Sequence, residues 1–357
     1  MINSYTSWQP LEEVIVGRSY PPEYFDYIKD PKVRAQLQQI LAETEEDLNH
    51  LQKTIETYGA RVYRPDIIER EWFERSQIPD HPFFEGRRHD HIATVPLPPL
   101  TPRDWQITLG DKLLRITPQR EVDAICAQYR DQVVSPSNRE WAGEKIYDPE
   151  SPLNGANASC IVRVGRDVFF DNSDYLKPEH TRWIVDNVLG PEYRIHEART
   201  DGHGDAVFAI LKPGVILSSK HDVNLDLARD FPGWEVLKIM DSSIDAAMSV
   251  GRFKQENFND RWYVQGQTPT PEFRSYVDQY LSTWVGYVKE TVFDVNCLVL
   301  DESNVIFSAY NKSVFDFCER HQINPIISEL RHSYFWDGGI SCCTQDLSRK
   351  GGLETYL

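Results

Sequence analysis

Residues 161–170, Ile161-Val162-Arg163-Val164-Gly165-Arg166-Asp167-Val168-Phe169-Phe170, form two apolar runs on either side of a short polar turn that begins with glycine. This pattern is typical of a β-hairpin. Three other segments have a similar form, and they span residues 107–116, 209–218 and 298–307. The first three turns recur at a period of about 50 residues, and self-similarity of this kind indicates a repeat architecture.

The segments that follow the hairpins extend the repeat. A helical pattern follows each hairpin, at residues 120–130, 177–188, 223–230 and 312–321. A short apolar run then follows at least the last three, at residues 193–195, 234–239 and 324–327. A hairpin-helix-strand unit repeated four or five times predicts a propeller-like ring of α/β units. Two conventional α/β domains are the alternative.

The rest of the chain is less regular. Residues 11–17 and 60–64 have the pattern of strands, and helical spacing of apolar residues predicts a helix over 31–58. We expect one domain over residues 1–357, with an insertion at about 240–290 that interrupts the period. That insertion is either a lid or subunit contact, or a packed pair of surface helices.

Composition excludes several classes of function. The chain has 357 residues, a formal charge of −17 and a pI of about 5.0, and it lacks the basic cluster of a nucleic-acid-binding protein. Six scattered cysteines without a CxxC pair argue against a disulfide framework and against structural zinc. No signal peptide or membrane span is predicted, so we expect a cytoplasmic protein. The pair His89 and His91 is better explained as a polar loop than as a metal site.

Polar residues precede the first strand of the hairpins. Before three of them lie Asp104, Asn157, and the pair His203 and Asp205. Near the end of the chain, the segment Gly338-Gly339-Ile340-Ser341-Cys342-Cys343 precedes another apolar run. In a ring of repeats, equivalent positions face the same axis, so these side chains should meet there.

Such a set suits chemistry on a guanidinium group. A cysteine beside a histidine can act as a nucleophile, and two carboxylates can hold a planar cation through charge-assisted hydrogen bonds. A bound guanidinium would also favour the thiolate. Three alternatives remain: Cys342 and Cys343 as buried packing residues, a papain-like protease, and His203 with Asp205 as metal ligands.

The chain resembles the amidinotransferases, typified by arginine:glycine amidinotransferase, of the guanidino-group-modifying (pentein) superfamily. The resemblance spans nearly the whole chain and rests on several short motifs. These are residues 8–18, Pro102-Arg103-Asp104, Arg163-x-Gly165-Arg166-Asp167, His203-x-Asp205, Pro213-Gly214, Gly338-Gly339-x-x-Cys342-x-Thr344 and residues 346–357. It implies a fivefold pseudo-symmetric α/β propeller.

The resemblance also implies a mechanism without metal or organic cofactor. Cys342 attacks the guanidinium carbon of L-arginine, and His203 protonates the departing ornithine. An acceptor amine, such as glycine, then attacks the amidino-cysteine to give a product such as guanidinoacetate. Asp104 and Asp205 match the family's guanidinium-binding carboxylates, and Arg103, Gly339 and Ser341 are further candidates for substrate contact.

The chain departs from the family pattern at several positions. Asn157 stands where an aspartate usually orients the histidine; asparagine can accept a hydrogen bond from imidazole but provides no charge. Cys160 replaces a second acid. The family's arginine that holds the donor's carboxylate would fall at residues 220–222, where this chain has no arginine. The family's serine that contacts the same carboxylate would fall near Glu290. The donor, the acceptor or both are therefore expected to differ from arginine and glycine.

Two other activities remain open. One is a guanidine hydrolase or deiminase that passes the same cysteine intermediate to water, and the other is a non-catalytic guanidine binder. The expected partners are a small guanidine donor and an amine acceptor, with neither nucleic acid nor membrane. A homodimer is one assembly to test, by analogy with the family.

Overall fold

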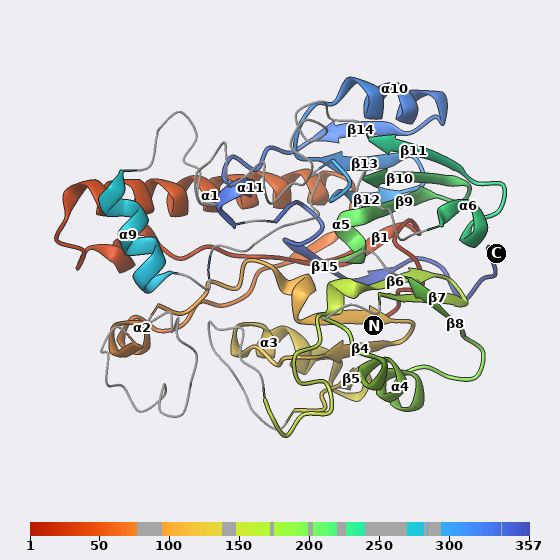
Figure 1. Cartoon of the computed structure of the whole chain (residues 1–357), viewed down its shortest axis with the longest axis horizontal. Helices are drawn as coiled ribbons and strands as arrows, with labels where there is room; N and C mark the ends of the chain where they lie inside the picture. The colour runs from red at the N-terminus through yellow and green to blue at the C-terminus, as the bar shows by residue number, and fades with distance from the viewer. Residues whose placement is uncertain are drawn as a thin grey trace.

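The structure is a computed structural model of the whole chain (Figure 1). It describes residues 1–76, 95–137, 148–171, 175–198, 203–219, 226–239, 270–281, 284, 294–336 and 338–357. His89 and His91, residues 220–222 and Glu290 lie outside these ranges. Of the expected insertion at 240–290, only residues 270–281 and 284 are described.

The described strands form five three-stranded sheets. In each sheet the central strand pairs antiparallel with one neighbour and parallel with the other. The first sheet is β3 (Gln106–Leu109), β4 (Lys112–Arg115) and β5 (Val133–Val134), and the second is β6 (Ile161–Val164), β7 (Asp167–Asp171) and β8 (Arg194–Ala198). The third is β9 (Phe208–Lys212), β10 (Val215–Ser219) and β11 (Glu235–Ile239), and the fourth is β12 (Leu298–Asp301), β13 (Asn304–Phe307) and β14 (Asn324–Ile327). The predicted hairpin-helix-strand repeat and the α/β propeller are confirmed.

The fifth unit joins the two ends of the chain. Strand β15 (Thr344–Arg349) pairs antiparallel with β1 (Leu11–Val16), and β1 pairs parallel with β2 (Arg61–Tyr63). Helix α1 (Pro31–Thr57) connects β1 to β2. The last strand therefore takes the place of the first hairpin strand, and the ring closes between residues far apart in sequence (Figure 1).

Helices connect the second and third strands of the other units. They are α3 (Asp123–Cys126), α4 (Pro178–Asn187), α6 (Leu227–Asp230) and α10 (Lys312–Arg320). The helix expected over 120–130 is wrong in extent, because α3 is a single turn flanked by 3-10 turns. Tyr129 has non-helical φ of −124° there, and its hydroxyl bonds to Glu13 and Tyr63 of the neighbouring unit. These tertiary contacts outweigh the weak local preference for a helix.

Three helices lie beside the ring in Figure 1: the N-terminal part of α1, α2 (Arg70–Ser76) and α9 (Pro271–Tyr280). Asp30 caps α1 by accepting from the backbone N–H of Lys32, and Pro31 occupies the first turn, where its missing N–H costs nothing. Phe273 and Val277 of α9 belong to the same apolar cluster as the buried face of α1. None of the helices in the described ranges is long and apolar enough to cross a membrane.

Candidate active site

Each of the five units presents a polar residue just before its first strand. Asp104 ends the 3-10 turn Pro102–Asp104, Asn157 precedes the 3-10 turn Ala158–Cys160, and His203 precedes the short helix α5 (Gly204–Val207). Asn296 and Cys342 precede β12 and β15. Asp104, Asn296 and Cys342 each lie two residues before their strand begins. Asn296 was not predicted from the sequence as a site residue, although its position matches that of Asp104.

Cys342 carries the thiol of this group, and only 6% of the residue is exposed. Burial raises the pKa of its thiol well above 9.0, and the carboxylates of Asp205 and Asp104 raise it further. In the free protein the thiol is therefore neutral. Cys343 is also buried, and it packs in the apolar cluster around α1, as expected for a packing residue.

The two carboxylates face the same space as the thiol. Asp104 accepts a hydrogen bond from the Thr101 hydroxyl at 2.9 Å. Asp205 accepts one from the Ser341 hydroxyl at 2.8 Å through Oδ2, whereas its buried Oδ1 has no hydrogen-bond partner among the described residues. Burial raises the pKa of Asp205, against the lowering effect of Arg103 and His203. A buried carboxylate oxygen without a partner is suited to a cationic ligand.

His203 is held between two units. Its Nδ1 lies 3.8 Å from Asp104 Oδ1, and the Tyr175 ring packs edge-on against the imidazole with centroids 5.4 Å apart. On the other side, Asn157 Nδ2 lies 3.1 Å from His203 Nε2.

The orientation of the Asn157 amide is fixed by Ser159. Both the backbone N–H and the hydroxyl of Ser159 bond to Asn157 Oδ1, at 2.9 and 2.7 Å. Because a backbone N–H can only donate, Oδ1 must face Ser159 and the NH2 group must face the histidine. In this orientation Asn157 donates to Nε2 of His203, which requires an unprotonated Nε2.

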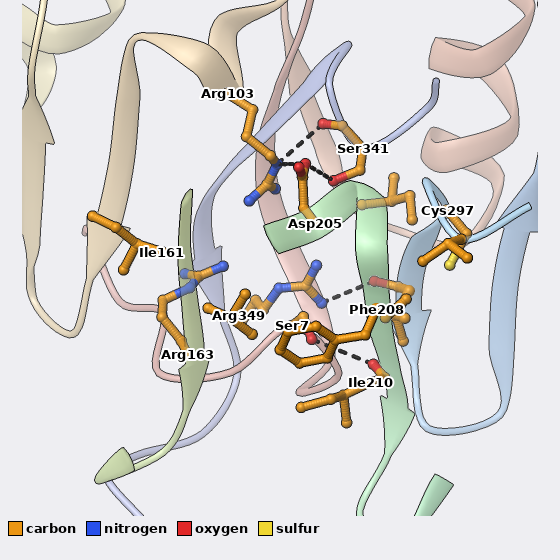
Figure 2. Close-up of a pocket in the computed structure, with 15 residues that line it drawn as sticks. Ser7, Arg103, Ile161, Arg163, Asp205, Phe208, Ile210, Cys297, Ser341 and Arg349 are labelled. Atoms are coloured by element: carbon orange, nitrogen blue, oxygen red, sulfur yellow. Dashed lines mark hydrogen bonds and ion pairs between the residues drawn. The ribbon is translucent and has the colours of Figure 1, made fainter. Parts of the chain in front are cut away.

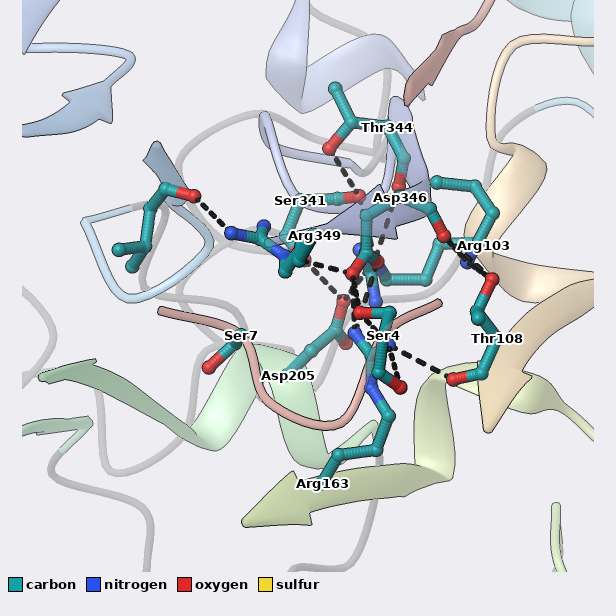
Figure 3. Close-up of polar contacts among 12 residues, drawn as sticks. Ser4, Ser7, Arg103, Thr108, Arg163, Asp205, Ser341, Thr344, Asp346 and Arg349 are labelled. Atoms are coloured by element: carbon teal, nitrogen blue, oxygen red, sulfur yellow. Dashed lines mark hydrogen bonds and ion pairs between the residues drawn. The ribbon is translucent and has the colours of Figure 1, made fainter. Parts of the chain in front are cut away.

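Arg103 contacts protein groups. Its Nε donates to the backbone carbonyls of Ser341 and Thr344 at 3.1 Å, and its Nη2 donates to Asp346 at 3.1 Å (Figure 3). Asp205 Oδ2 is 3.9 Å from Arg103 Nε. Arg103 thus links the loop that carries Cys342 to the buried centre of the ring.

Asp346 is the shared partner of the polar groups at that centre, and no role for it was predicted from the sequence. Its carboxylate accepts from Arg103, Arg163, Arg349 and the Ser4 hydroxyl (Figure 3). The arginines hold the pKa of Asp346 well below 3.8 despite complete burial. The sequence feature that could have indicated this cluster is the pair Asp346 and Arg349, which lie three residues apart in the buried strand β15.

A small cavity of about 60 Å³ lies beneath the site (Figure 2). Arg103, Asp205 and Ser341 line one side of it, and Arg163 and Arg349 line the other (Figure 2). Its size corresponds to one or two water molecules. Among the described residues, no group of three His, Cys, Asp or Glu side chains has the arrangement of a metal site.

No family model matches the chain. The chain is 23% identical over 396 residues to inosamine-phosphate amidinotransferase 1 of Streptomyces glaucescens, an alignment that covers 100% of this chain and 99% of that protein. It is 23% identical over 413 residues to mitochondrial glycine amidinotransferase of Gallus gallus, covering 99% and 84%. The structure of inosamine-phosphate amidinotransferase StrB1 from Streptomyces griseus aligns with a TM-score of 0.65 at 21% identity, covering 100% of this chain and 99% of that one.

The three relatives named above are amidinotransferases. The resemblance stated from the sequence is thus confirmed, and so is the pentein fold. By their names, these relatives are transferases. Of the eight site residues predicted from the sequence, seven have been placed above, and the eighth, Gly339, lies against Asn296.

Proposed function

We propose that this protein transfers an amidino group from L-arginine or a related guanidine to an acceptor amine, through a covalent intermediate on Cys342. The observation that carries the proposal is the buried thiol of Cys342 between two carboxylates, Asp104 and Asp205, with His203 beside them. A metal or organic cofactor is not required for this chemistry.

The donor guanidinium binds between Asp104 and Asp205. Its N–H groups match carboxylate oxygens in charge and geometry, and Asp205 Oδ1 has no competing protein donor among the described residues. The cation also offsets the two negative charges that raise the pKa of the Cys342 thiol. Substrate binding therefore promotes formation of the thiolate, while the free enzyme stays unreactive.

The first half-reaction forms a carbon–sulfur bond and breaks a carbon–nitrogen bond. Cys342 Sγ attacks the guanidinium carbon, and the thiol proton passes to His203. His203 returns that proton to the departing amine, which is ornithine when arginine is the donor, and an amidino-cysteine remains. In the second half-reaction the acceptor amine attacks the same carbon, His203 takes its proton, and the Cys342 thiolate leaves and is reprotonated.

Arg103, Gly339 and Ser341 support this site without forming the reacting bonds. Ser341 donates to Asp205, and Arg103 holds the backbone of Ser341 and Thr344. Contact of these residues with substrate remains a prediction from the family resemblance, as does a homodimer.

The identities of the donor and the acceptor are the least constrained elements of the proposal. Two of the departures from the family pattern, at residues 220–222 and at Glu290, concern contacts to the donor's carboxylate and lie outside the described ranges. The names of the relatives provide two acceptors to test, glycine and an inosamine phosphate.

Product analysis tests the proposal. The protein is incubated with arginine and each acceptor, and with a panel of other guanidines and amines, and products are identified by mass spectrometry. Ornithine together with a guanidino-amine supports transfer. Citrulline or ammonia without an acceptor supports hydrolysis, and binding without turnover across the panel identifies a guanidine binder; either result contradicts the proposed transfer.

Asn157→Asp should increase kcat about tenfold. One carboxylate oxygen can still accept from Ser159. The other oxygen takes the place of the NH2 group that faces His203, so that an acceptor and a negative charge stabilise protonated His203. Steady-state kinetics with the best donor measure the effect. Asn154→Asp adds the same charge to the same loop and should change kcat little; a fall in kcat for Asn157→Asp would contradict the assigned amide orientation.

A further inference from the structure

Asn296 contacts Cys342 with both ends of its side-chain amide. Its Oδ1 accepts from the backbone N–H of Cys342 at 3.1 Å, and its Nδ2 donates to Cys342 Sγ at 3.0 Å. Asn296 is completely buried, and it comes from the fourth unit of the ring, whereas Cys342 comes from the fifth. The side chain therefore links the two units at the reacting atom itself.

The amide orientation is determined by its partner. Because the Cys342 N–H can only donate, Oδ1 must face it, and the NH2 group must then face the sulfur. The Asn296 backbone carbonyl also accepts from the N–H groups of Ile340 and Ser341, at 3.1 and 3.3 Å. Asn296 thus makes four hydrogen bonds to the loop that carries the thiol.

Gly339 gives a second, independent indication that this contact is built into the fold. A Cβ atom at position 339 would lie 2.6 Å from Asn296 Oδ1, 2.7 Å from its Cβ and 2.8 Å from its Cγ. These distances are below van der Waals contact, so any larger residue would push Asn296 away from the sulfur. Glycine at 339 therefore makes room for the Asn296 amide.

We propose that Asn296 is a catalytic residue whose amide N–H donates to the Cys342 thiolate in both half-reactions. The surroundings of Cys342 otherwise disfavour negative charge, since the site is buried and two carboxylates face it. A neutral donor at 3.0 Å stabilises the thiolate without competing with the donor cation for Asp104 and Asp205. A hydrogen bond from the Gly339 backbone also lowers the pKa of the Cys342 thiol.

Two substitutions separate the donor from the acceptor function of Asn296. Asn296→Asp keeps an oxygen for the Cys342 N–H but replaces the donor facing Sγ with an acceptor. Asn296→Ala removes both groups. The backbone carbonyl of residue 296 is retained in both variants. Asn324→Asp, an exposed position at the start of β14 in the same unit, is the matched charge control.

The first readout is alkylation of Cys342 by iodoacetamide as a function of pH, with tandem mass spectrometry to distinguish it from Cys343. The midpoint of the pH–rate curve reports thiolate formation, and the plateau reports access. We expect the midpoint to rise by about one pH unit in Asn296→Asp and Asn296→Ala, and not in Asn324→Asp, so that alkylation below the midpoint slows about tenfold.

The second readout is turnover. We expect kcat/KM to fall about 10- to 100-fold in both Asn296 variants. An alkylation midpoint and a turnover like those of the unmodified protein in Asn296→Asp would overturn the proposal, because positioning through the Cys342 N–H would then suffice. If Asn296→Asp does not fold, the alkylation midpoint of Asn296→Ala decides alone.

The proposal rests on Cys342 being the nucleophile of the proposed function, but its failure can be recognised separately. Alkylation needs no guanidine, so the midpoint tests Asn296 even if no donor turns over. Conversely, if the Asn296 variants turn over the donor and their alkylation midpoint is unchanged, the role of Asn296 is refuted and the proposed amidino transfer is not affected.

Discussion

Replacing Cys342 with serine should reduce kcat at least about 10⁴-fold, because the nucleophile is lost from a group that acts as a unit. A serine hydroxyl is a much weaker nucleophile than a thiolate, and the carboxylates of Asp104 and Asp205 face it and oppose an alkoxide. Binding of the donor should survive, since both carboxylates remain. Turnover and equilibrium binding of the donor measure the two effects.

Cys343→Ser is the matched control for this prediction. Cys343 is the adjacent residue, equally buried, and burial raises the pKa of its thiol to about 12. Its backbone carbonyl, which accepts from Gly17 N–H, is unchanged by the substitution. Activity should stay within about tenfold of the unmodified protein, at some cost in stability.

The covalent intermediate gives a second test. Incubation with the donor in the absence of an acceptor should add the mass of one amidino group to the unmodified protein and to Cys343→Ser, but not to Cys342→Ser. An adduct on Cys343, or inactivity of Cys343→Ser with activity in Cys342→Ser, would show that the nucleophile is assigned to the wrong thiol.

The ring could be predicted from sequence because each of four units is local. The hairpin, helix and third strand of a unit follow one another, and positive φ at Gly110, Gly165 and Gly214 marks three of the turns. The fifth unit is different, because β15 and β1 pair across the whole chain. No local pattern specifies that pairing. The two-residue strand β5 is likewise too short to leave a periodic signal.

The site residues could be found in part, because each precedes a strand of the repeat. Their hydrogen-bond directions could not, since these depend on third partners. Asn157 donates to His203 because Ser159 occupies its oxygen, and Asn296 donates to Cys342 because the Cys342 N–H occupies its oxygen. Arg103 lies next to Asp104 in sequence, yet its contacts lead into the ring because Asp346 and two backbone carbonyls draw it there.

Asp346→Asn should destabilise the protein by about 3–5 kcal/mol, the cost of removing one partner from a buried ionic cluster. The asparagine keeps the shape and can still accept from Ser4, but Arg103, Arg163 and Arg349 lose their shared counter-charge. The urea midpoint at pH 7 measures the loss. Asp316→Asn, which removes an exposed ion pair with Lys312, should change the urea midpoint little.

The same substitution has a defined pH dependence. An unfolded aspartate has a pKa of about 3.9, and the arginines lower the pKa of folded Asp346 well below its ordinary value. The stabilisation is therefore fully present above about pH 5 and is lost as the pH falls towards the folded pKa. The difference in urea midpoint between the unmodified protein and Asp346→Asn should be largest near neutral pH and shrink below about pH 4.

Asp346→Asn should also affect the active site. Asp346 holds Arg103, and Arg103 holds the carbonyls of Ser341 and Thr344 on either side of Cys342. Asp346→Asn should therefore lower kcat even under conditions where the variant remains folded, while Asp316→Asn should not. An unchanged kcat in folded Asp346→Asn would show that the loop is held by Asn296 alone and that the buried cluster serves stability only.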